Sequence, residues 1–165
     1  MNAIYLIGFM GSGKTTVSQE LANKLEVPVY DTDREIVQKA GKTIIEIFAI
    51  DGEDGFRRLE TEVLYSMPEA DVVVATGGGI IGSEKNRLFL KEKVVVFLHA
   101  EVRVIMDRLK DDDTRPLLRK DSREAAEKLY NSRLPLYRET ATIEIDTSGK
   151  AVSRIVDEII QRMKK

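Results

Sequence analysis

The 165-residue chain contains no cysteine and a single histidine, His99. Without cysteine it can form neither a disulfide nor a thiolate nucleophile, and a Cys-ligated zinc site is excluded. One histidine supplies neither a His-rich metal site nor an obvious Ser/His pair, so we expect His99 to be structural. Neither sign of charge dominates, since 26 Lys and Arg face 28 Asp and Glu for a net charge of -2. This balance argues against nucleic acid and anionic membranes as partners.

Long apolar runs are also missing. The first residues are apolar and uncharged, but the run ends at Gly8 and is too short for a signal peptide or a membrane span. We therefore expect a cytoplasmic protein. With 42% hydrophobic and 33% charged residues, a chain of this length can bury one core, and we expect a single domain over residues 1–165.

What the sequence does contain is a series of short apolar runs bounded by Gly, Pro or Asp. Such runs are typical of strands that are buried on both faces of a parallel sheet. The five runs cover residues 4–7, 27–30, 72–75, 94–98 and 142–145. Amphipathic helical patterns lie between them, so the sequence predicts an α/β fold with about five strands.

Two segments have the spacing of a helix-capping box, in which a Thr and a Glu three residues later satisfy the first N–H groups of a helix. They are Thr32 with Glu35 and Thr43 with Glu46.

The segment 111–121 differs from the rest of the chain, because it is polar and lacks periodicity. We expect it to form an exposed loop, and loops of this length in a compact domain are often lids.

The clearest motif is Gly-Phe-Met-Gly-Ser-Gly-Lys-Thr at 8–15, which fits the phosphate-binding pattern G-x-x-x-x-G-K-[ST]. It follows an apolar run and precedes an amphipathic segment, as a P-loop must. Main-chain N–H groups and the positive end of the helix are expected to surround the phosphates. We expect Lys14 to reach the β- and γ-phosphates and the Thr15 hydroxyl to bind Mg²⁺. The expected ATP-binding residues of this motif are Gly11, Ser12, Gly13, Lys14, Thr15 and Thr16.

A P-loop indicates a bound nucleotide but does not define the reaction. The chain has little room for the additional elements of a motor, and it has no NKxD-like guanine signature. A kinase that acts on a small molecule or a nucleotide is therefore the favoured class.

Asp31-Thr32-Asp33 directly follows the second apolar run. If the chain stays extended there, both carboxylates project to one side at the carboxyl edge of the sheet, where open α/β sheets bind ligands. One carboxylate is then expected to help hold Mg²⁺ through water, and the other to accept a hydrogen bond from an attacking hydroxyl. Alternatively, Thr32 caps a helix and the two aspartates complement the helix dipole.

The third apolar run leads into Gly77-Gly78-Gly79 and lacks the aspartate that ends a Walker B strand. Asp31 is therefore the nearest candidate for the carboxylate at the Mg²⁺ site. Three consecutive glycines are costly in backbone entropy, and they suit a ligand that must touch main-chain N–H groups. A plain tight turn is the alternative.

The sequence resembles the shikimate kinase family, small members of the P-loop nucleoside-monophosphate-kinase-like fold. The resemblance covers nearly the whole chain and six motifs: 8–15, Asp-Thr-Asp at 31–33, Phe-Arg-Arg-Leu-Glu at 56–60, Gly-Gly-Gly at 77–79, Arg-Pro-Leu-Leu at 115–118, and Arg-Leu-Pro-Leu-Tyr at 133–137. It implies a three-layer α/β/α fold with a five-stranded parallel sheet of order 2-3-1-4-5 and a lid. It also implies ATP-dependent phosphorylation of the 3-hydroxyl of shikimate, with Mg²⁺, in chorismate and aromatic amino-acid biosynthesis. We expect ATP and shikimate as partners, and a monomer.

The same resemblance assigns roles on the acceptor side. Arg57 and Arg133 are expected to hold the carboxylate of shikimate, for which the planar guanidinium geometry is suited. Asp33 is expected to accept the hydroxyls as a catalytic residue, and the N–H groups of Gly78 or Gly79 to donate to the substrate.

On the nucleotide side the resemblance adds two arginines to Lys14. Arg115, in the expected lid, would contact ATP and neutralise the transferred group, so that Lys14, Asp33 and Arg115 form the catalytic set. Arg108 resembles an adenine-stacking residue. The loop at 146–150, where the family makes a second adenine contact, lacks the arginine and proline often found there.

The arginines also have ordinary explanations. Arg57 is three residues before Glu60 and Arg58 is four before Glu62, so both pairs suit ion pairs on a helix surface. Arg108 and Arg133 suit solvated positions on a helix.

Two rival functions fit the same motifs. One is a gluconate-type or nucleoside-monophosphate kinase, against which the two arginines, Asp33 and the three glycines argue. The other is a nucleotide-binding module without catalysis, against which the presence of a residue for every expected polar role argues.

Overall fold

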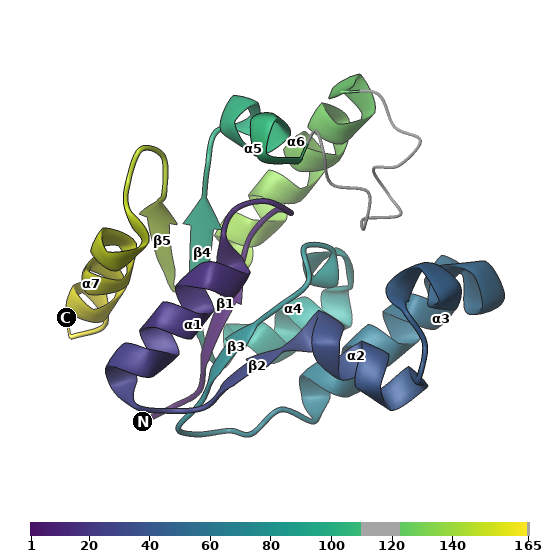
Figure 1. The fold of residues 1–165 in the computed structure, drawn as a ribbon, viewed down its shortest axis with the longest axis horizontal. Coiled ribbons are helices and arrows are strands. Elements are labelled where there is room, and N and C mark those ends of the chain that lie inside the picture. The colour runs from purple at the N-terminus through teal and green to yellow at the C-terminus, as the bar shows by residue number, and fades with distance from the viewer. Residues whose placement is uncertain (110–122, 165) are drawn as a thin grey trace.

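The computed structural model describes residues 1–109 and 123–164 of the chain, which Figure 1 shows as ribbons. The expected lid at 111–121, with Arg115 and Pro116, lies outside these residues. Within the described ranges, no helix combines the length and the apolar composition that are needed to cross a membrane.

Strands and helices alternate along the chain. The strands are β1 (Ile4–Ile7), β2 (Val29–Asp31), β3 (Val73–Ala75), β4 (Val94–His99) and β5 (Ile143–Asp146). The α-helices are α1 (Lys14–Leu25), α2 (Thr32–Ala40), α3 (Ile44–Tyr65), α4 (Glu84–Lys91), α5 (Val102–Leu109), α6 (Arg123–Thr140) and α7 (Val152–Met163). A 3-10 helix, η1, covers Ile80–Gly82.

The five strands form one parallel sheet in the order β2-β3-β1-β4-β5. The predicted fold class and strand order are therefore confirmed. The central strand β1 places Ile4 opposite both Val73 of β3 and Val94 of β4. Because all strands run in one direction, the segments that follow β1, β2 and β3 emerge at the same edge of the sheet, where Figure 1 shows the tip of the P-loop and the start of α2.

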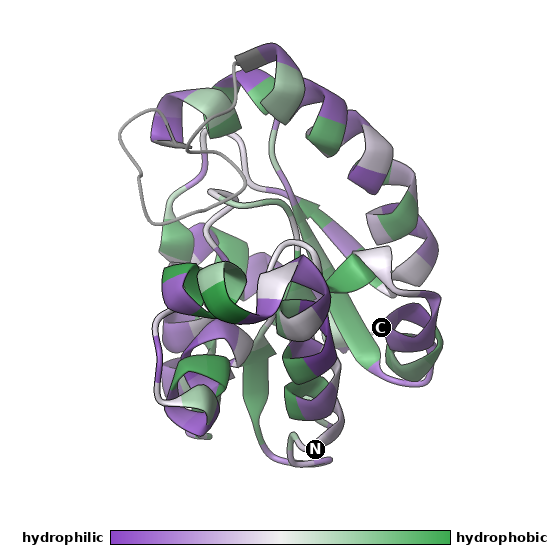
Figure 2. Cartoon of the chain, turned by 90° about the vertical axis from the view of Figure 1, so that its right-hand side faces the viewer, coloured by the Kyte–Doolittle hydropathy of each residue, from purple (hydrophilic) through white to green (hydrophobic). Residues whose placement is uncertain are grey.

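Alternate side chains of β1 enter two separate cores. Tyr5 and Ile7 pack with buried residues of α2 to α6, whereas Ile4 and Leu6 pack with buried residues of α1 and α7. Helices therefore cover both faces of the sheet and give the predicted three layers. Figure 2 shows the strands as largely hydrophobic and the helices as mixed, which explains why the strands are near-continuous apolar runs in the sequence.

Helix α2 begins with a different cap from the one predicted. The Asp31 carboxylate, not the Thr32 hydroxyl, accepts from the N–H groups of Asp33 at 3.0 Å and Arg34 at 3.3 Å. Thr32 is already helical, and its buried hydroxyl accepts from the N–H of Gly77 at 3.0 Å. The prediction of a capping box of Thr32 with Glu35 is therefore wrong. The condition of an extended chain through 31–33 is not met either, because α2 begins at Thr32.

The second capping box, at the start of α3, is confirmed. The Glu46 N–H donates to the Thr43 hydroxyl at 3.2 Å, and the Thr43 N–H donates to the Glu46 carboxylate at 3.0 Å. Each side chain thus satisfies an N–H group that has no partner within the helix.

His99, at the end of β4, joins the sheet to α6. Its Nε2 atom lies 3.1 Å from the hydroxyl of Tyr130, which donates to the carbonyl of Ala100 at 2.9 Å. The main-chain carbonyl of His99 accepts from the N–H of Thr147 at 2.8 Å. These contacts fit the structural role expected for the histidine.

The capping box gives a prediction about stability. Thr43→Ala should lower the free energy of unfolding by about 1 kcal/mol, because it removes the acceptor for the Glu46 N–H. Thr43→Ser, which keeps the hydroxyl, should stay close to the wild type in the same urea titration. Equal stability of the alanine variant and the wild type would show that the box contributes nothing.

Candidate active site

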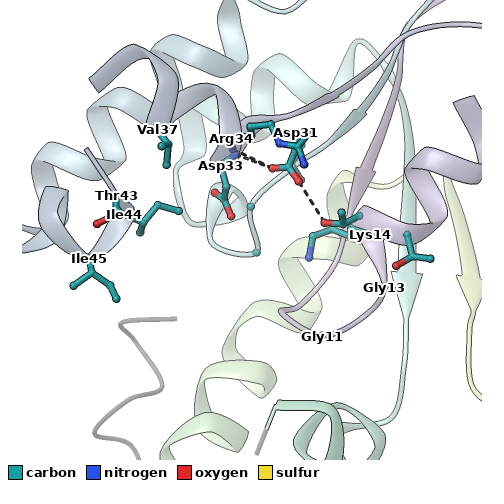
Figure 3. Close-up of a pocket in the computed structure, with 15 residues that line it drawn as sticks. Gly11, Gly13, Lys14, Asp31, Asp33, Arg34, Val37, Thr43, Ile44 and Ile45 are labelled. Carbon is teal, nitrogen blue, oxygen red and sulfur yellow. Dashed lines mark hydrogen bonds between the residues drawn. The ribbon is translucent and has the colours of Figure 1, made fainter. Parts of the chain in front are cut away.

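A cavity of about 660 Å³ opens at the carboxyl edge of the sheet, and Figure 3 shows it in close-up. Its walls come from the P-loop and the first turn of α1, from Asp31 to Val37, from Thr43 to Ile45, and from Thr76 to Gly78. In Figure 3, Asp33 lies between the P-loop on one side and Thr43 to Ile45 on the other. The cavity thus joins the predicted nucleotide and acceptor sides.

The P-loop lysine points back at its own loop. Lys14 Nζ donates to the main-chain carbonyls of Gly8 at 2.6 Å and Phe9 at 2.9 Å. The hydroxyl of Ser12 is buried and has no hydrogen-bond partner among the described residues. Arg108, from α5, donates to the carbonyl of Gly11 at 2.8 Å. Arg108 is exposed on its helix but lies against the P-loop, next to the predicted nucleotide site.

The predicted magnesium residues meet at the start of α1 and α2. The Thr15 hydroxyl donates to Asp31 Oδ2 at 3.3 Å. The other oxygen, Asp31 Oδ1, is held by the two N–H groups at the start of α2. The cap of α2 therefore aims the remaining carboxylate oxygen at the P-loop. A hydroxyl and a carboxylate are hard oxygen donors of the kind that Mg²⁺ prefers, and both residues fit such a site.

The triple glycine is explained by the charged side chains packed against it and not by unusual backbone angles. None of Gly77, Gly78 and Gly79 has a positive φ. A Cβ on Gly77 would lie 2.8 Å from Asp33 Oδ1 and 3.0 Å from Glu60 Oε2, and a Cβ on Gly79 would lie 2.8 Å from Arg57 Cζ. Glycine thus lets two carboxylates and a guanidinium contact the main chain directly, which a plain tight turn does not need.

Arg57 makes the ion pair that its spacing suggested and still lies at the glycines. Its guanidinium is 2.9 Å from Glu60 and 3.3 Å from Glu53. The same guanidinium contacts Gly79, and Arg57 lines a second depression together with Arg58 and Ser83. The two explanations for Arg57 are therefore compatible. In the second pair considered, Glu62 contacts Lys39 at 3.0 Å.

Arg133 is not a solvated helix arginine, because only 7% of its surface is exposed. Its guanidinium lies over the ring of Phe9, 5.6 Å from the centroid, and close to Tyr137 one turn later on the same helix. Its Nη1 atom is buried and has no hydrogen-bond partner among the described residues. Burial lowers the pKa of the guanidinium, with Arg57 adding to the effect.

Glu60 also belongs to the candidate site, although it was not among the site residues predicted from the sequence. It is 1% exposed, and its Oε2 atom has no hydrogen-bond partner among the described residues. Burial raises the pKa of this carboxyl to about 7, the charge of Asp33 adds to the rise, and Arg57 and Arg133 oppose it. Its place in the Phe-Arg-Arg-Leu-Glu motif was the one available signal, but spacing alone described Glu60 only as a surface partner of Arg57.

With this geometry established, comparison with known proteins is decisive. A sequence model of the family described as "Shikimate kinase" matches residues 10–164. The chain belongs to the shikimate kinase family. A curated shikimate kinase of Bacillus cytotoxicus is 44% identical over 164 residues, which cover 99% of both chains. The family resemblance predicted from the six motifs is confirmed.

Solved shikimate kinases have the same fold. Shikimate kinase from Acinetobacter baumannii in complex with shikimate has a TM-score of 0.94 at 41% identity, covering 99% of this chain and 93% of that one. The enzyme from Aquifex aeolicus has a TM-score of 0.87 at 38% identity, covering 98% and 96%. As a shikimate kinase family member, the chain is a small-molecule kinase with a P-loop.

The pKa of Glu60 makes stability depend on pH. Below its ordinary value of 4.5, the carboxyl is protonated in both the folded and the unfolded chain. Between pH 4.5 and about pH 7, the carboxyl has lost its proton in the unfolded chain but keeps it in the folded chain. The free energy of unfolding therefore falls as the pH rises through this range. The stability of the wild type relative to Glu60→Gln should fall by about 3 kcal/mol between about pH 4.5 and about pH 8.

Chemical denaturation of both proteins across this range measures the difference. Glu53→Gln is the control, because Glu53 contacts the same arginine but is 54% exposed, and exposed ion pairs contribute about 1 kcal/mol or less. Parallel stability curves for wild type and Glu60→Gln would contradict the buried, titrating carboxyl.

Proposed function

We propose that this shikimate kinase family member transfers the γ-phosphoryl group of ATP to the 3-hydroxyl of shikimate, with Mg²⁺. The observation that carries the proposal is the meeting of Arg57, Arg133, Asp33 and Glu60 around a triple glycine, beside a P-loop. The 41% identical neighbour in complex with shikimate supports the choice of acceptor.

The two arginines suit the carboxylate of shikimate. Arg133 Nη1 is buried without a hydrogen-bond partner, and a buried donor without an acceptor costs about 1–3 kcal/mol. A bound carboxylate supplies the missing acceptor, and a guanidinium offers two parallel donors to its two oxygens. Arg57 reaches the same region through its contact with Gly79.

The two carboxylates have different roles in the proposal. Asp33 lines the cavity on the side that faces the P-loop. In the proposal, Asp33 accepts a hydrogen bond from the 3-hydroxyl and so directs an oxygen lone pair at the γ-phosphorus. The N–H groups of Gly78 and Gly79 add donors, and Glu60 holds Arg57 in place.

The P-loop residues hold the transferred group. Gly11, Ser12, Gly13 and Thr16 belong to the phosphate cradle, and Lys14 exchanges its carbonyl partners for the β- and γ-phosphates. Arg108 lies on the nucleotide side and stacks on adenine. Arg115 lies outside the described residues, and the family resemblance gives it the role of contacting the transferring phosphoryl oxygens.

Thr15 and Asp31 would hold Mg²⁺, Asp31 through a water molecule. When bound there, the ion would supply positive charge against the phosphate oxygens. Asp31 also explains why the site needs no Walker B aspartate, because its carboxylate reaches Thr15 from the neighbouring element.

The working form in this proposal is a cytoplasmic monomer that consists of one P-loop kinase domain over residues 1–165. Every residue that the proposal uses comes from one chain, and its two substrates, ATP and shikimate, are small anions. Because the net charge is only -2, the chain as a whole does not attract these anions. In the proposal, individual cations such as Lys14 and Arg133 bind them.

The deciding experiment is an ATP-consumption assay with Mg-ATP and shikimate. ADP should appear in equal amounts with a phosphomonoester of shikimate, detected by phosphorus NMR, and gluconate and nucleoside monophosphates should give no comparable turnover. Turnover with one of those acceptors would favour the rival kinases. No turnover with any acceptor, from protein shown to bind ATP, would favour a binding module.

Adjacent arginines provide a matched test of the carboxylate site. Arg57→Ala should raise KM for shikimate about 30-fold or more, because it removes a charged hydrogen-bond donor, and should leave KM for ATP within about twofold. Arg58→Ala removes the same charge one residue later and should leave both constants near wild type. A similar effect of the two variants in steady-state assays would indicate a general electrostatic effect instead.

A further inference from the structure

The hydroxyl of Tyr137 connects two parts of the acceptor site that are far apart in the sequence. Tyr137 is 1% exposed, and its ring stacks on Phe97 of β4 with centroids 5.0 Å apart. Its hydroxyl donates to the main-chain carbonyl of Gly78 at 2.5 Å. The guanidinium of Arg133 lies near the same hydroxyl, where its charge opposes the effect of burial on the pKa of Tyr137. The hydroxyl therefore lies between the buried arginine and the triple glycine.

Holding the Gly78 carbonyl also sets the direction of the next N–H group. A trans peptide is planar, so the carbonyl of Gly78 and the N–H of Gly79 point in opposite directions. A hydrogen bond from the buried hydroxyl to this carbonyl turns the Gly79 N–H away from Tyr137. This peptide needs such an anchor, because glycine on both sides gives it little resistance to flipping over.

The neighbouring parts of the loop are held by other side chains. The Gly77 N–H donates to Thr32 at 3.0 Å, and Asn86 Nδ2 donates to the carbonyl of Ile80 at 2.9 Å. The carbonyls of Gly77 and Gly79 also accept from the N–H groups of Ile80 and Gly82, at 3.2 and 3.0 Å. These bonds restrain the residues on either side, and the Tyr137 bond fixes the carbonyl of the peptide between Gly78 and Gly79.

We propose that Tyr137 is a positioning residue for the acceptor, which orients the Arg133 guanidinium and the Gly79 N–H through one shared hydroxyl. The inference rests on the proposed function, in which these two groups bind shikimate. Packing of the ring alone does not account for the hydroxyl, since a phenylalanine would bury the same ring without a polar atom. Burial raises the pKa of Tyr137, so the hydroxyl keeps its proton and remains a donor at physiological pH.

Tyr130 is a matched control on the same helix. It is 7% exposed, and its hydroxyl also has two polar contacts, to the Ala100 carbonyl at 2.9 Å and to His99 at 3.1 Å. These contacts lead to the end of β4 and not to the triple glycine. Tyr130→Phe and Tyr137→Phe therefore each remove one buried, hydrogen-bonded hydroxyl, but only the latter affects the acceptor groups.

The test is a steady-state comparison of the two variants with the wild type. Tyr137→Phe should raise KM for shikimate about tenfold, with KM for ATP within about twofold of wild type. Tyr130→Phe should leave KM for shikimate unchanged, and thermal unfolding should show similar losses of stability for both. An unchanged KM for shikimate in Tyr137→Phe, or equal increases in both variants, would overturn the inference.

Two further outcomes are distinguishable. A wild type without shikimate-dependent turnover overturns the proposed function, and the positioning role with it, whereas an active wild type with an unaffected Tyr137→Phe overturns the positioning role alone. If Tyr137→Phe does not fold, NMR of the glycine-labelled wild type decides. A peptide held by Tyr137 gives one sharp Gly79 amide resonance that moves when shikimate is added, and several exchanging resonances would contradict it.

Discussion

The proposed acceptor site depends on the burial of opposite charges around a segment of backbone without side chains. Burying charged groups is costly unless they are paired and hydrogen-bonded. The pair of Arg57 with Glu60 offsets part of this cost, but Glu60 Oε2 and Arg133 Nη1 still have no partners among the described residues. In the proposed function, the carboxylate of shikimate supplies the acceptor that Arg133 Nη1 lacks. Glycine at 77 and 79 follows from the same constraint, since side chains there would occupy the space of these charges.

The parallel sheet brings the two halves of the site together. The P-loop follows β1, the start of α2 follows β2, and the triple glycine follows β3, and these three strands are neighbours in the sheet. The Asp31 carboxylate serves the fold and the site at once, since one oxygen caps α2 and the other accepts from Thr15. Helix α6 adds Arg133 and Tyr137 from the opposite end of the chain, and packs them against the P-loop and the triple glycine.

Much of this arrangement could be predicted from the sequence. The strand order came from the family resemblance, while the alternation of apolar runs and helices indicated the fold class directly. The eight residues of the P-loop form a contiguous motif, so their spacing alone identified them. The prediction failed at Thr32, where three polar residues in a row offered several caps and only the contact with Gly77 decided among them. Glu60 and Tyr137 lie within family motifs, but nothing local in the sequence shows that both side chains are buried at the triple glycine.

The sequence by itself determined the features that depend on neighbouring residues: the strands, the capping box of Thr43, the P-loop and the candidate cations. Local spacing is sufficient for the capping box and the P-loop, because they satisfy their backbone groups within a few residues, whereas the strands are recognised by their apolar runs. The tertiary structure alone decided which of the charges are buried, which hydrogen-bond partners remain missing, and which side chains hold the triple glycine. Those properties arise between residues that are 45 to 59 positions apart, as in Thr32 with Gly77 and Tyr137 with Gly78. Their physical origin is the order of strands in the sheet, which brings these residues together and excludes water from them.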